Sequence, residues 1–373
     1  MRDRGMGESA DERFMSRALE LARFGRGRTS PNPPVGAVVV SRGEVIGEGW
    51  HQKAGTPHAE IHALAQAGSR ALGAALYVTL EPCCHDNKRT PPCVDAVLSS
   101  GVSRVVVSAV DPNPRVRGKG ITRLRRAGIE VVTGVLEEEG RGVIREYAWH
   151  MRTGFPFVTL KMAQSLDGKI ATARGESKWI TGPAARGIVH KMRAEADAVM
   201  VGAGTVQRDD PSLLPRGPSL EGRRPLRVVV DGNLSIPPGA KMLADGLGPV
   251  VIACRRDASP VRRRRLEKRG AEIAAFPASR SGIDLRRLMA ALGARGVMSI
   301  LAEGGGDLAA SLLAAGVVRE VAFFVAPVVI GGEDSIGSVG GASPRRLSGA
   351  IRLGPMSVER VGKDILIRAE VNP

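Results

Sequence analysis

Aromatic side chains are scarce in this chain of 373 residues, which has only 7 Phe, 3 Trp and 2 Tyr. Proteins that bind single-stranded nucleic acid stack bases on aromatic side chains, so this scarcity argues against a nucleic-acid partner. The net charge of +16 gives a general affinity for phosphate groups. It suits small anionic molecules such as phosphate esters and nucleotides equally well, and an arginine-rich composition produces it without any function.

Long apolar runs and abundant cysteines are also missing. No run approaches the ~18 apolar residues of a membrane span, and the N-terminal segment lacks the apolar stretch of a secretory signal. Three of the four cysteines lie between positions 83 and 93, which suits a metal site in a reducing compartment better than a disulfide framework. We therefore expect a cytoplasmic protein without membrane contacts, in which Cys254 is a buried apolar residue.

Helix and strand patterns alternate along the chain, as in α/β proteins, and the length predicts more than one domain. The segment Glu137-Glu-Glu-Gly-Arg-Gly, followed by residues 149–154, indicates that a first domain covers 1–152 and a second covers 153–373. A helix is expected to begin at His58, with Thr56 as its cap. The other main elements expected are helices over 11–24, 94–98, 182–196 and 308–315, and strands over 35–40, 76–79, 104–109, 198–201, 226–230 and 297–302.

Three zinc-ligating side chains lie in the first domain: His58, Cys83 and Cys93. One His and two Cys leave the fourth tetrahedral position to water, whose pKa zinc lowers toward neutrality, so the set favours a catalytic over a structural zinc. Glu60 is then the proton carrier. The pattern matches the H-x-E…P-C-x-x-C signature of zinc-dependent nucleobase deaminases, except that nine residues separate the two cysteines here.

Two details of this zinc site stay open at the level of sequence. Cys84 lies beside Cys83 and could take its ligand position, although Cys83 directly follows the proline of the signature. Residues two apart on a regular helix point to nearly opposite sides. His58 and Glu60 can therefore face one metal only if His58 lies in the irregular first turn of its helix.

A glycine turn is expected near the end of the second domain, where the strand over 297–302 runs into Glu303-Gly-Gly-Gly-Asp307 and then a helix. Such a turn lets backbone N–H groups at a helix N-terminus approach a phosphate closely. Neither the G-x-G-x-x-G pattern nor the P-loop pattern is present, so an ordinary turn remains an alternative to a phosphate site.

Several longer motifs occur in a fixed order along the chain. They are Thr29-Ser-Pro-Asn-Pro-Pro-Val-Gly-Ala-Val, His58-Ala-Glu, Thr79-Leu-Glu-Pro-Cys-Cys-His, Lys161-Met-Ala-Gln-Ser-Leu-Asp-Gly-Lys, Gly175-Glu-Ser-Lys-Trp-Ile-Thr, Val201-Gly-Ala-Gly-Thr-Val-Gln-Arg-Asp-Asp-Pro and Ala302-Glu-Gly-Gly-Gly. Together they closely resemble the family of bifunctional riboflavin-biosynthesis deaminase-reductases, over nearly the whole chain. The resemblance implies a cytidine-deaminase-like α/β/α domain joined to a dihydrofolate-reductase-like α/β domain.

The same resemblance implies two reactions on a small phosphoribosyl pyrimidine. The first domain would use Zn²⁺ to deaminate 2,5-diamino-6-(5-phosphoribosylamino)-4-pyrimidinone, and the second would use NADPH to reduce the ribosyl side chain to ribityl. We also expect a homo-oligomer. A nucleic-acid base deaminase with an accessory domain would share the zinc residues, whereas a non-catalytic nucleotide-binding regulator would have no need of Glu60.

The family's site residues carry over onto matching positions of this sequence. Those at the pyrimidine of the deaminase would be Asn32, His51, Lys88 and Arg89; those at NADPH would be Ala163, Trp179, Thr205, Asp209, Gly304, Gly305 and Gly306; those at the reductase substrate would be Lys161, Ser177, Arg193, Leu213, Arg216 and Glu303. The family usually has one residue fewer between its cysteines and a single basic residue there. Which of Lys88 and Arg89 contacts the substrate therefore stays open.

Overall fold

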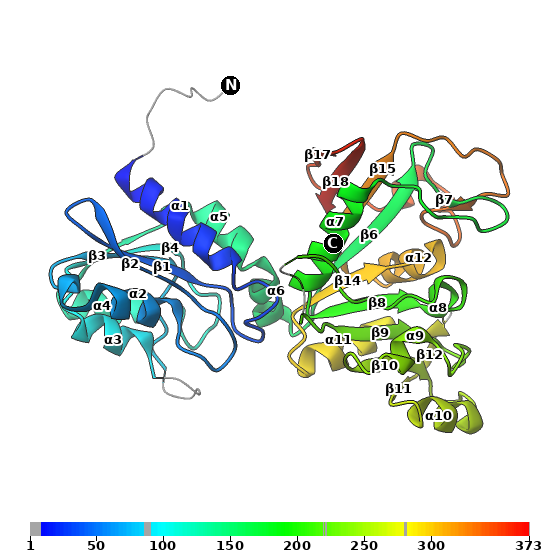
Figure 1. The fold of residues 1–373 in the computed structure, drawn as a ribbon, viewed down its shortest axis with the longest axis horizontal. Coiled ribbons are helices and arrows are strands. Elements are labelled where there is room, and N and C mark those ends of the chain that lie inside the picture. The colour runs from blue at the N-terminus through cyan, green and yellow to red at the C-terminus, as the bar shows by residue number, and fades with distance from the viewer. Residues whose placement is uncertain (1–8, 86–90, 219, 221, 280–281, 373) are drawn as a thin grey trace. The chain divides into compact units, whose positions relative to one another are not determined.

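The computed structural model describes residues 9–85, 91–218, 220, 222–279 and 282–372. The chain forms two compact units, residues 1–154 and 155–373, and Figure 1 shows the elements of each. Each unit has its own sheet and its own buried core, so both belong to the α/β class expected from the sequence. Among the helices of the described residues, none is long and apolar enough to cross a membrane.

A five-stranded sheet in the order β2-β1-β3-β4-β5 forms the centre of the N-terminal unit. β1 pairs antiparallel with β2 and β3, whereas β3, β4 and β5 run parallel. Helices α1 and α5 cover one face, and α2, α3 and α4 cover the other (Figure 1). The bounds are α1 Ala10–Arg23, β1 Gly36–Ser41, β2 Glu44–Trp50, α2 Ala59–Ala67, the 3₁₀ helix η1 Gly68–Ala71, β3 Ala75–Leu80, α3 Cys93–Ser99, β4 Arg104–Ala109, α4 Lys119–Arg126, β5 Glu130–Thr133, α5 Glu137–Val143 and α6 Arg145–Thr153.

Helix α2 begins in close contact with β2. A Cβ atom at Gly49 would lie 2.5 Å from the carbonyl oxygen of Ala59, so only glycine lets the first turn of the helix lie this near to the strand. The N-cap of α2 is His58, in an extended conformation with φ −77° and ψ 170°. The expectation that Thr56 caps the helix is wrong, because the helix starts later and the Thr56 hydroxyl donates to the carbonyl of Lys53 instead.

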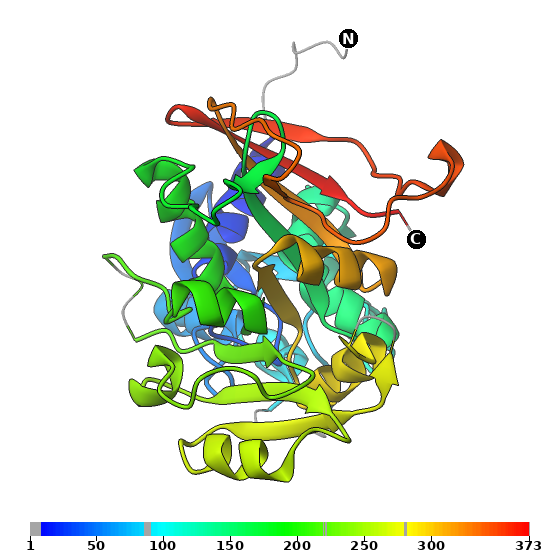
Figure 2. The same ribbon diagram turned by 90° about the vertical axis from the view of Figure 1, so that its right-hand side faces the viewer.

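A nine-stranded sheet in the order β11-β10-β9-β8-β14-β6-β15-β18-β17 forms the C-terminal unit, and Figure 2 shows it running from β11 to β17. The strands from β11 to β15 are parallel, and β18 and β17 extend the sheet antiparallel. The bounds are β6 Phe157–Ser165, β7 Lys169–Ala171, α7 Pro183–Glu195, β8 Ala198–Gly202, α8 Ala203–Asp209, β9 Leu226–Val230, α9 Lys241–Ala244, β10 Val250–Arg255, α10 Pro260–Glu267, β11 Glu272–Phe276, β12 Ala278–Ser279, β13 Gly282–Ile283, α11 Leu285–Ala294, β14 Ser299–Glu303, α12 Gly306–Ala314, β15 Val318–Ala326, β16 Ile336–Gly337, the 3₁₀ helix η2 Leu347–Gly349, β17 Ser357–Val361 and β18 Asp364–Glu370.

The glycine turn after β14 is required by its surroundings. A Cβ atom at Gly306, the first residue of α12, would lie 2.8 Å from the carbonyl oxygen of Gly337. Gly304 has φ +144°, a conformation that residues with a side chain rarely adopt. Cys254 is fully buried in β10, as expected. The antiparallel extension β15-β18-β17 was not expected from the sequence.

Candidate functional site

Three zinc-ligating side chains of the N-terminal unit meet in space. The Nδ1 atom of His58 lies 3.1 Å from the Sγ atom of Cys93 and 3.5 Å from that of Cys83. These three atoms all lie within 4.8 Å of one another, which suits one tetrahedral zinc ion with a fourth position left for water. Cys84 is not part of this group; it packs partly buried against the apolar core.

Each ligand lies at the end of a secondary-structure element. His58 is the N-cap of α2, Cys83 follows β3, and Cys93 is the first residue of α3. The backbone N–H of Cys93 donates to the Sγ atom of Cys83 over 3.4 Å, and N–H donors of this kind stabilise a thiolate. The Cys83 sulfur is therefore stabilised in the thiolate form that binds metal.

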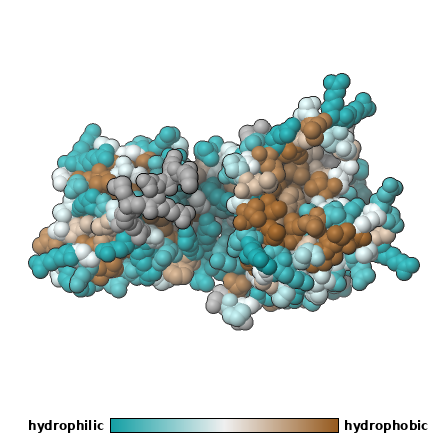
Figure 3. Space-filling model, turned by 90° about the horizontal axis from the view of Figure 1, so that it is seen from above, coloured by the Kyte–Doolittle hydropathy of each residue, from teal (hydrophilic) through white to brown (hydrophobic). Residues whose placement is uncertain are grey.

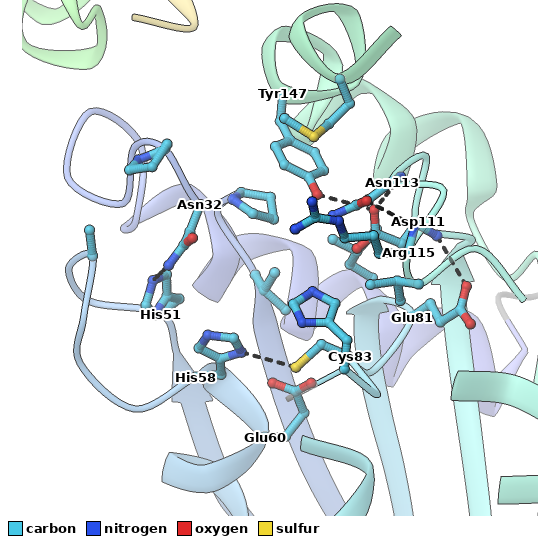
Figure 4. A pocket seen from close by; sticks show the side chains of 18 of the residues that line it. Asn32, His51, His58, Glu60, Glu81, Cys83, Asp111, Asn113, Arg115 and Tyr147 are labelled. Atoms are coloured by element: carbon cyan, nitrogen blue, oxygen red, sulfur yellow. Dashed lines mark hydrogen bonds between the residues drawn. The ribbon is translucent and has the colours of Figure 1, made fainter. Parts of the chain in front are cut away.

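Glu60 lies in the first turn of α2, beside the zinc ligands (Figure 4). Its side chain is buried, and its Oε2 atom has no hydrogen-bond partner within the described part of the chain. Burial, together with the nearby Cys83, raises the pKa of the Glu60 carboxyl above its usual value. A buried carboxylate oxygen without a partner, next to a three-ligand set, fits a water molecule on the metal. The extended N-cap conformation of His58 lets the two side chains face the same point.

His51 and Asn32 form a hydrogen-bonded pair at another side of the same cavity (Figure 4). The Asn32 amide nitrogen lies 3.2 Å from His51 Nε2, and His51 Nδ1 lies 3.2 Å from the carbonyl oxygen of Pro57. With the proton on Nδ1, the ring donates to Pro57 and accepts from Asn32. Burial lowers the pKa of His51, so the neutral ring that this arrangement needs is favoured.

A cavity of about 490 Å³ connects these groups with a second set of polar side chains. Its size suits a nucleotide-sized ligand. Figure 4 shows Asp111, Asn113, Arg115 and Tyr147 at the end of the cavity away from His58 and Glu60. Sequence reasoning did not name these residues, although Asp111 follows the buried strand β4 at the carboxyl end of a parallel pair, where ligands commonly bind.

The loop that carries these residues is tied to the zinc site by Glu81, two residues before Cys83. The buried Glu81 carboxylate accepts hydrogen bonds from the backbone N–H groups of Asp111, Gly118, Gly120 and Ile121 at 2.8–3.3 Å. Burial raises the pKa of Asp111 to about 6, although its carboxylate accepts from the Tyr147 hydroxyl over 3.2 Å and from the Asn113 N–H. The far wall of the cavity is thus fixed relative to the metal ligands.

A buried charged cluster lies in the C-terminal unit. Arg193 donates two hydrogen bonds to the Glu303 carboxylate, at 2.6 and 2.9 Å, and the Lys161 ammonium lies 3.7 Å from the same carboxylate. Lys161 and Glu303 are neighbours in register on the parallel strands β6 and β14. Burial lowers the pKa of Lys161. Burial alone would raise the pKa of Glu303, but Arg193 and Lys161 outweigh it and hold that pKa at about 2.

The structure brings only some of the other expected reductase residues together. A side chain at Gly304 would lie 3.1 Å from the Thr205 hydroxyl, so the turn after β14 and the helix after β8 are adjacent. Trp179 is 71% exposed, and the Arg186 guanidinium lies 4.5 Å from the centre of its ring. The Asp209 carboxylate lies 3.8 Å from the Lys178 ammonium.

The remaining expected residues occupy the following places: Ala163 in β6, Gly305 and Gly306 at the start of α12, Ser177 partly buried before α7, Leu213 buried with φ +60°, and Arg216 exposed with its N–H donating to His190. Most of these positions follow strands β8, β14 and β6, at the carboxyl ends where ligands of open α/β sheets bind. Lys88 and Arg89 lie outside the described residues.

Two family models match the chain. The model of the cytidine and deoxycytidylate deaminase zinc-binding region covers residues 8–109, and that of the RibD C-terminal domain covers residues 156–367. The chain is also 42% identical to the riboflavin biosynthesis protein RibD of Aquifex aeolicus (strain VF5), over 96% of this chain and 97% of that protein.

Solved structures resemble the whole fold as well. RibD of Acinetobacter baumannii, form 1, superposes with a TM-score of 0.86 at 38% identity, covering 98% of this chain and 99% of that one. A diaminohydroxyphosphoribosylaminopyrimidine deaminase/5-amino-6-(5-phosphoribosylamino)uracil reductase of Thermotoga maritima superposes with a TM-score of 0.85 at 36% identity, covering 97% and 99% of the two chains.

Proposed function

Because the chain belongs to the RibD family of bifunctional riboflavin-biosynthesis enzymes, with zinc-dependent deaminase and NADPH-dependent reductase activities, we propose how its residues divide these activities. Residues 1–152 form the deaminase and residues 153–373 the reductase. The grouping of His58, Cys83 and Cys93 around the buried Glu60 carries the first assignment. A cytoplasmic location is supported by the four cysteines, none of which forms a disulfide within the described residues.

The deaminase substrate that we propose is 2,5-diamino-6-(5-phosphoribosylamino)-4-pyrimidinone, a small molecule rather than a nucleic acid. The name of the Thermotoga maritima relative describes a deaminase of this compound class. Asn32 and His51 are proposed to hold the pyrimidine. Both line the cavity, and the Asn32 amide has a second proton for the substrate, whereas His51 is bonded to Asn32 and Pro57 and offers its ring. Lys88 and Arg89 are proposed substrate contacts in the segment between the two cysteine ligands.

Proton transfer in the deaminase is assigned to Glu60. A zinc ion held by His58, Cys83 and Cys93 supplies the lowered pKa of the attacking water. Glu60 would accept the two protons of that water in turn, passing one to the ring nitrogen and the other to the amino group that leaves as ammonia.

The reductase assignment rests on the charged cluster and the glycine turn. Lys161, Arg193 and Glu303 are proposed to bind the phosphoribosyl pyrimidine together with Ser177, Leu213 and Arg216, because guanidinium groups pair well with phosphate oxygens. NADPH supplies the hydride. Ala163, Trp179, Thr205, Asp209 and Gly304 to Gly306 are proposed to hold this cofactor, and the glycines allow the backbone to approach it closely.

Zinc removal is expected to separate the two activities. Dialysis against a chelator should abolish ammonia release from the diaminopyrimidine, because the attacking water is then no longer activated. NADPH oxidation on the deaminated product should persist, since none of the three ligands lies in the C-terminal unit. Coupled assays for ammonia and for NADPH absorbance, with zinc added back as the control, measure both. Full ammonia release from metal-free protein would contradict the deaminase assignment.

Association into a homo-oligomer is proposed through the outer edge of the C-terminal sheet. Strand β17 is the last strand of that sheet. Met356, directly before it, and Val358, within it, are 67% and 65% exposed. Figure 3 shows apolar surface gathered on the upper face of the C-terminal unit, the side on which Figure 1 places β17 and β18. An exposed apolar strand edge favours pairing with another chain, and a second copy offers an identical edge.

The substitution Val358→Lys is expected to convert the oligomer to a monomer, because a charged side chain cannot be buried unpaired in such a contact. Light scattering after size-exclusion chromatography measures the mass. The matched control is Val261→Lys, on α10, where the valine is 51% exposed and far along the sheet order from β17. A wild-type protein that is monomeric at micromolar concentration would contradict the proposal.

A further inference from the structure

We infer that Arg115 binds the phosphate group of the deaminase substrate, at the end of the cavity opposite the zinc ligands. This inference rests on the proposed deaminase function and adds the residue that recognises the phosphorylated end of the substrate. Figure 4 shows the Arg115 side chain reaching into the cavity beside Tyr147.

Arg115 provides positive charge where the cavity otherwise has little. Among the described residues that line it, Arg115 is the sole lysine or arginine. Its side chain is exposed, and no hydrogen bond or ion pair to its guanidinium group is formed within the described part of the chain. A cation that lines a cavity without an anionic partner among the described residues is suited to bind the anionic group of a ligand.

The carboxylates of Glu81 and Asp111, on the same wall of the cavity, do not form ion pairs with the Arg115 guanidinium group. Glu81 is buried and accepts its four backbone hydrogen bonds, and Asp111 accepts hydrogen bonds from Tyr147 and from the backbone of Asn113. Both carboxylates are thus satisfied within the protein, whereas the guanidinium group of Arg115 is open to solvent and to a ligand.

The backbone of Arg115 is held in a defined position relative to the metal site. The Asp111 carboxylate accepts the N–H of Asn113 over 2.8 Å, and the Asn113 side-chain oxygen accepts the N–H of Arg115 over 3.0 Å. Glu81 fixes the following segment to the end of β3, next to Cys83. The long side chain of Arg115 therefore starts from a fixed point, which reduces the entropy lost when it binds a phosphate.

The shape of the substrate matches this placement. Its amino-bearing ring carbon must reach the zinc-bound water near Glu60, with the ring beside Asn32 and His51, so the phosphoribosyl group has to extend away from the metal. Figure 4 shows the end of the cavity with Arg115 and Tyr147 on the side away from His58 and Glu60. A guanidinium group binds two phosphate oxygens at once, which makes it selective for a phosphate over a hydroxyl.

The test compares Arg115→Gln with wild-type enzyme on the phosphorylated diaminopyrimidine and on its dephosphorylated counterpart. For the phosphorylated substrate KM should rise by about 10- to 100-fold, as expected for the loss of a charged hydrogen-bonding partner, with kcat nearly unchanged. For the dephosphorylated substrate neither constant should change. Arg115→Lys should restore part of the difference, since it keeps the charge but not the two-pronged geometry. The matched control is Arg117→Gln, at an exposed position on the same loop that does not line the cavity.

Three outcomes would overturn the inference. One is an equal loss on both substrates, another is an equal loss in Arg117→Gln, and the third is an unchanged KM in Arg115→Gln while Lys88→Gln or Arg89→Gln raises it. A wild-type enzyme that releases no ammonia from either pyrimidine would instead overturn the proposed deaminase function, so the two failures are distinguishable.

Discussion

Glu60→Gln is expected to slow ammonia release by about 10²- to 10⁴-fold, the usual contribution of a positioned general acid–base group. Glutamine has nearly the same shape as glutamate, but it neither accepts a proton from the attacking water nor carries one to the leaving group. Zinc content should stay at one ion per chain, because the proposed ligands are His58, Cys83 and Cys93. Atomic absorption and an ammonia assay on the same preparation measure the two quantities.

The structure makes this expectation sharper than the sequence alone does. Glu60 is buried and its Oε2 atom has no partner within the described residues, so this oxygen is not needed to satisfy another protein group. Its replacement should leave the fold intact. NADPH oxidation should be unchanged when the deaminated product is supplied, because the Lys161–Arg193–Glu303 cluster belongs to the other unit.

A matched control lies on the same helix. His62→Gln changes a side chain within α2 that is outside the three-ligand group, so zinc and ammonia release should both persist. If Glu60→Gln retained more than about a tenth of the wild-type rate, the loss would be smaller than the roughly 10²-fold or more that general acid–base catalysis usually contributes. Another group would then have to carry the proton.

The grouping of the three proposed zinc ligands could be predicted from the sequence, because their residue types and spacing form a recognisable pattern. His-x-Glu and two Pro-Cys pairs each follow or begin a predicted element, and the fold brings them within 4.8 Å. Spacing could not show how His58 and Glu60 face one metal. That depends on the extended N-cap conformation of His58.

The far wall of the cavity could not be predicted in the same way. Glu81 follows β3, Asp111 and Arg115 follow β4, and Tyr147 lies on α6, so only the parallel pairing of β3 with β4 and the packing of the helices bring them together. The antiparallel strands β17 and β18 were missed for a related reason. The pairing of β18 with β15 joins segments separated by the long stretch 327–356, which has few regular elements.

Arg193→Met is expected to destabilise the C-terminal unit by about 3–5 kcal/mol, the usual cost of removing one partner of a buried ion pair. Arg193 donates two hydrogen bonds to the buried Glu303 carboxylate. Without them, that carboxylate keeps only Lys161, 3.7 Å away, to offset its lost hydration. Reductase activity should fall as well, because both side chains are proposed to bind the substrate. Urea unfolding followed by circular dichroism gives the stability, and NADPH oxidation gives the activity.

The pH dependence of this loss identifies its cause. Burial alone would raise the pKa of Glu303, but Arg193 and Lys161 hold it at about 2, below the ordinary value of 4.5. A carboxyl with a depressed pKa contributes stability that is fully present above its unfolded pKa and is lost as pH falls through the folded pKa. The unfolded state is the same in both proteins, so the difference between wild type and Arg193→Met is largest at a pH where Glu303 is ionised in both folded proteins. It should shrink as the pH falls toward 2, where the wild-type carboxyl also becomes protonated.

Two further variants distinguish the loss of the ion pair from a general disruption of helix α7. Lys191→Met removes an exposed cation of the same helix, 3.9 Å from Glu195, and should change stability by less than about 0.5 kcal/mol, as exposed pairs do. The double variant Arg193→Met, Glu303→Gln should lose less than the sum of the two single losses, because each substitution removes the charge that the other leaves unpaired. Additive losses, or a loss in Arg193→Met that does not vary between pH 5 and pH 2, would mean that packing of the arginine stem, rather than its charge, stabilises this site.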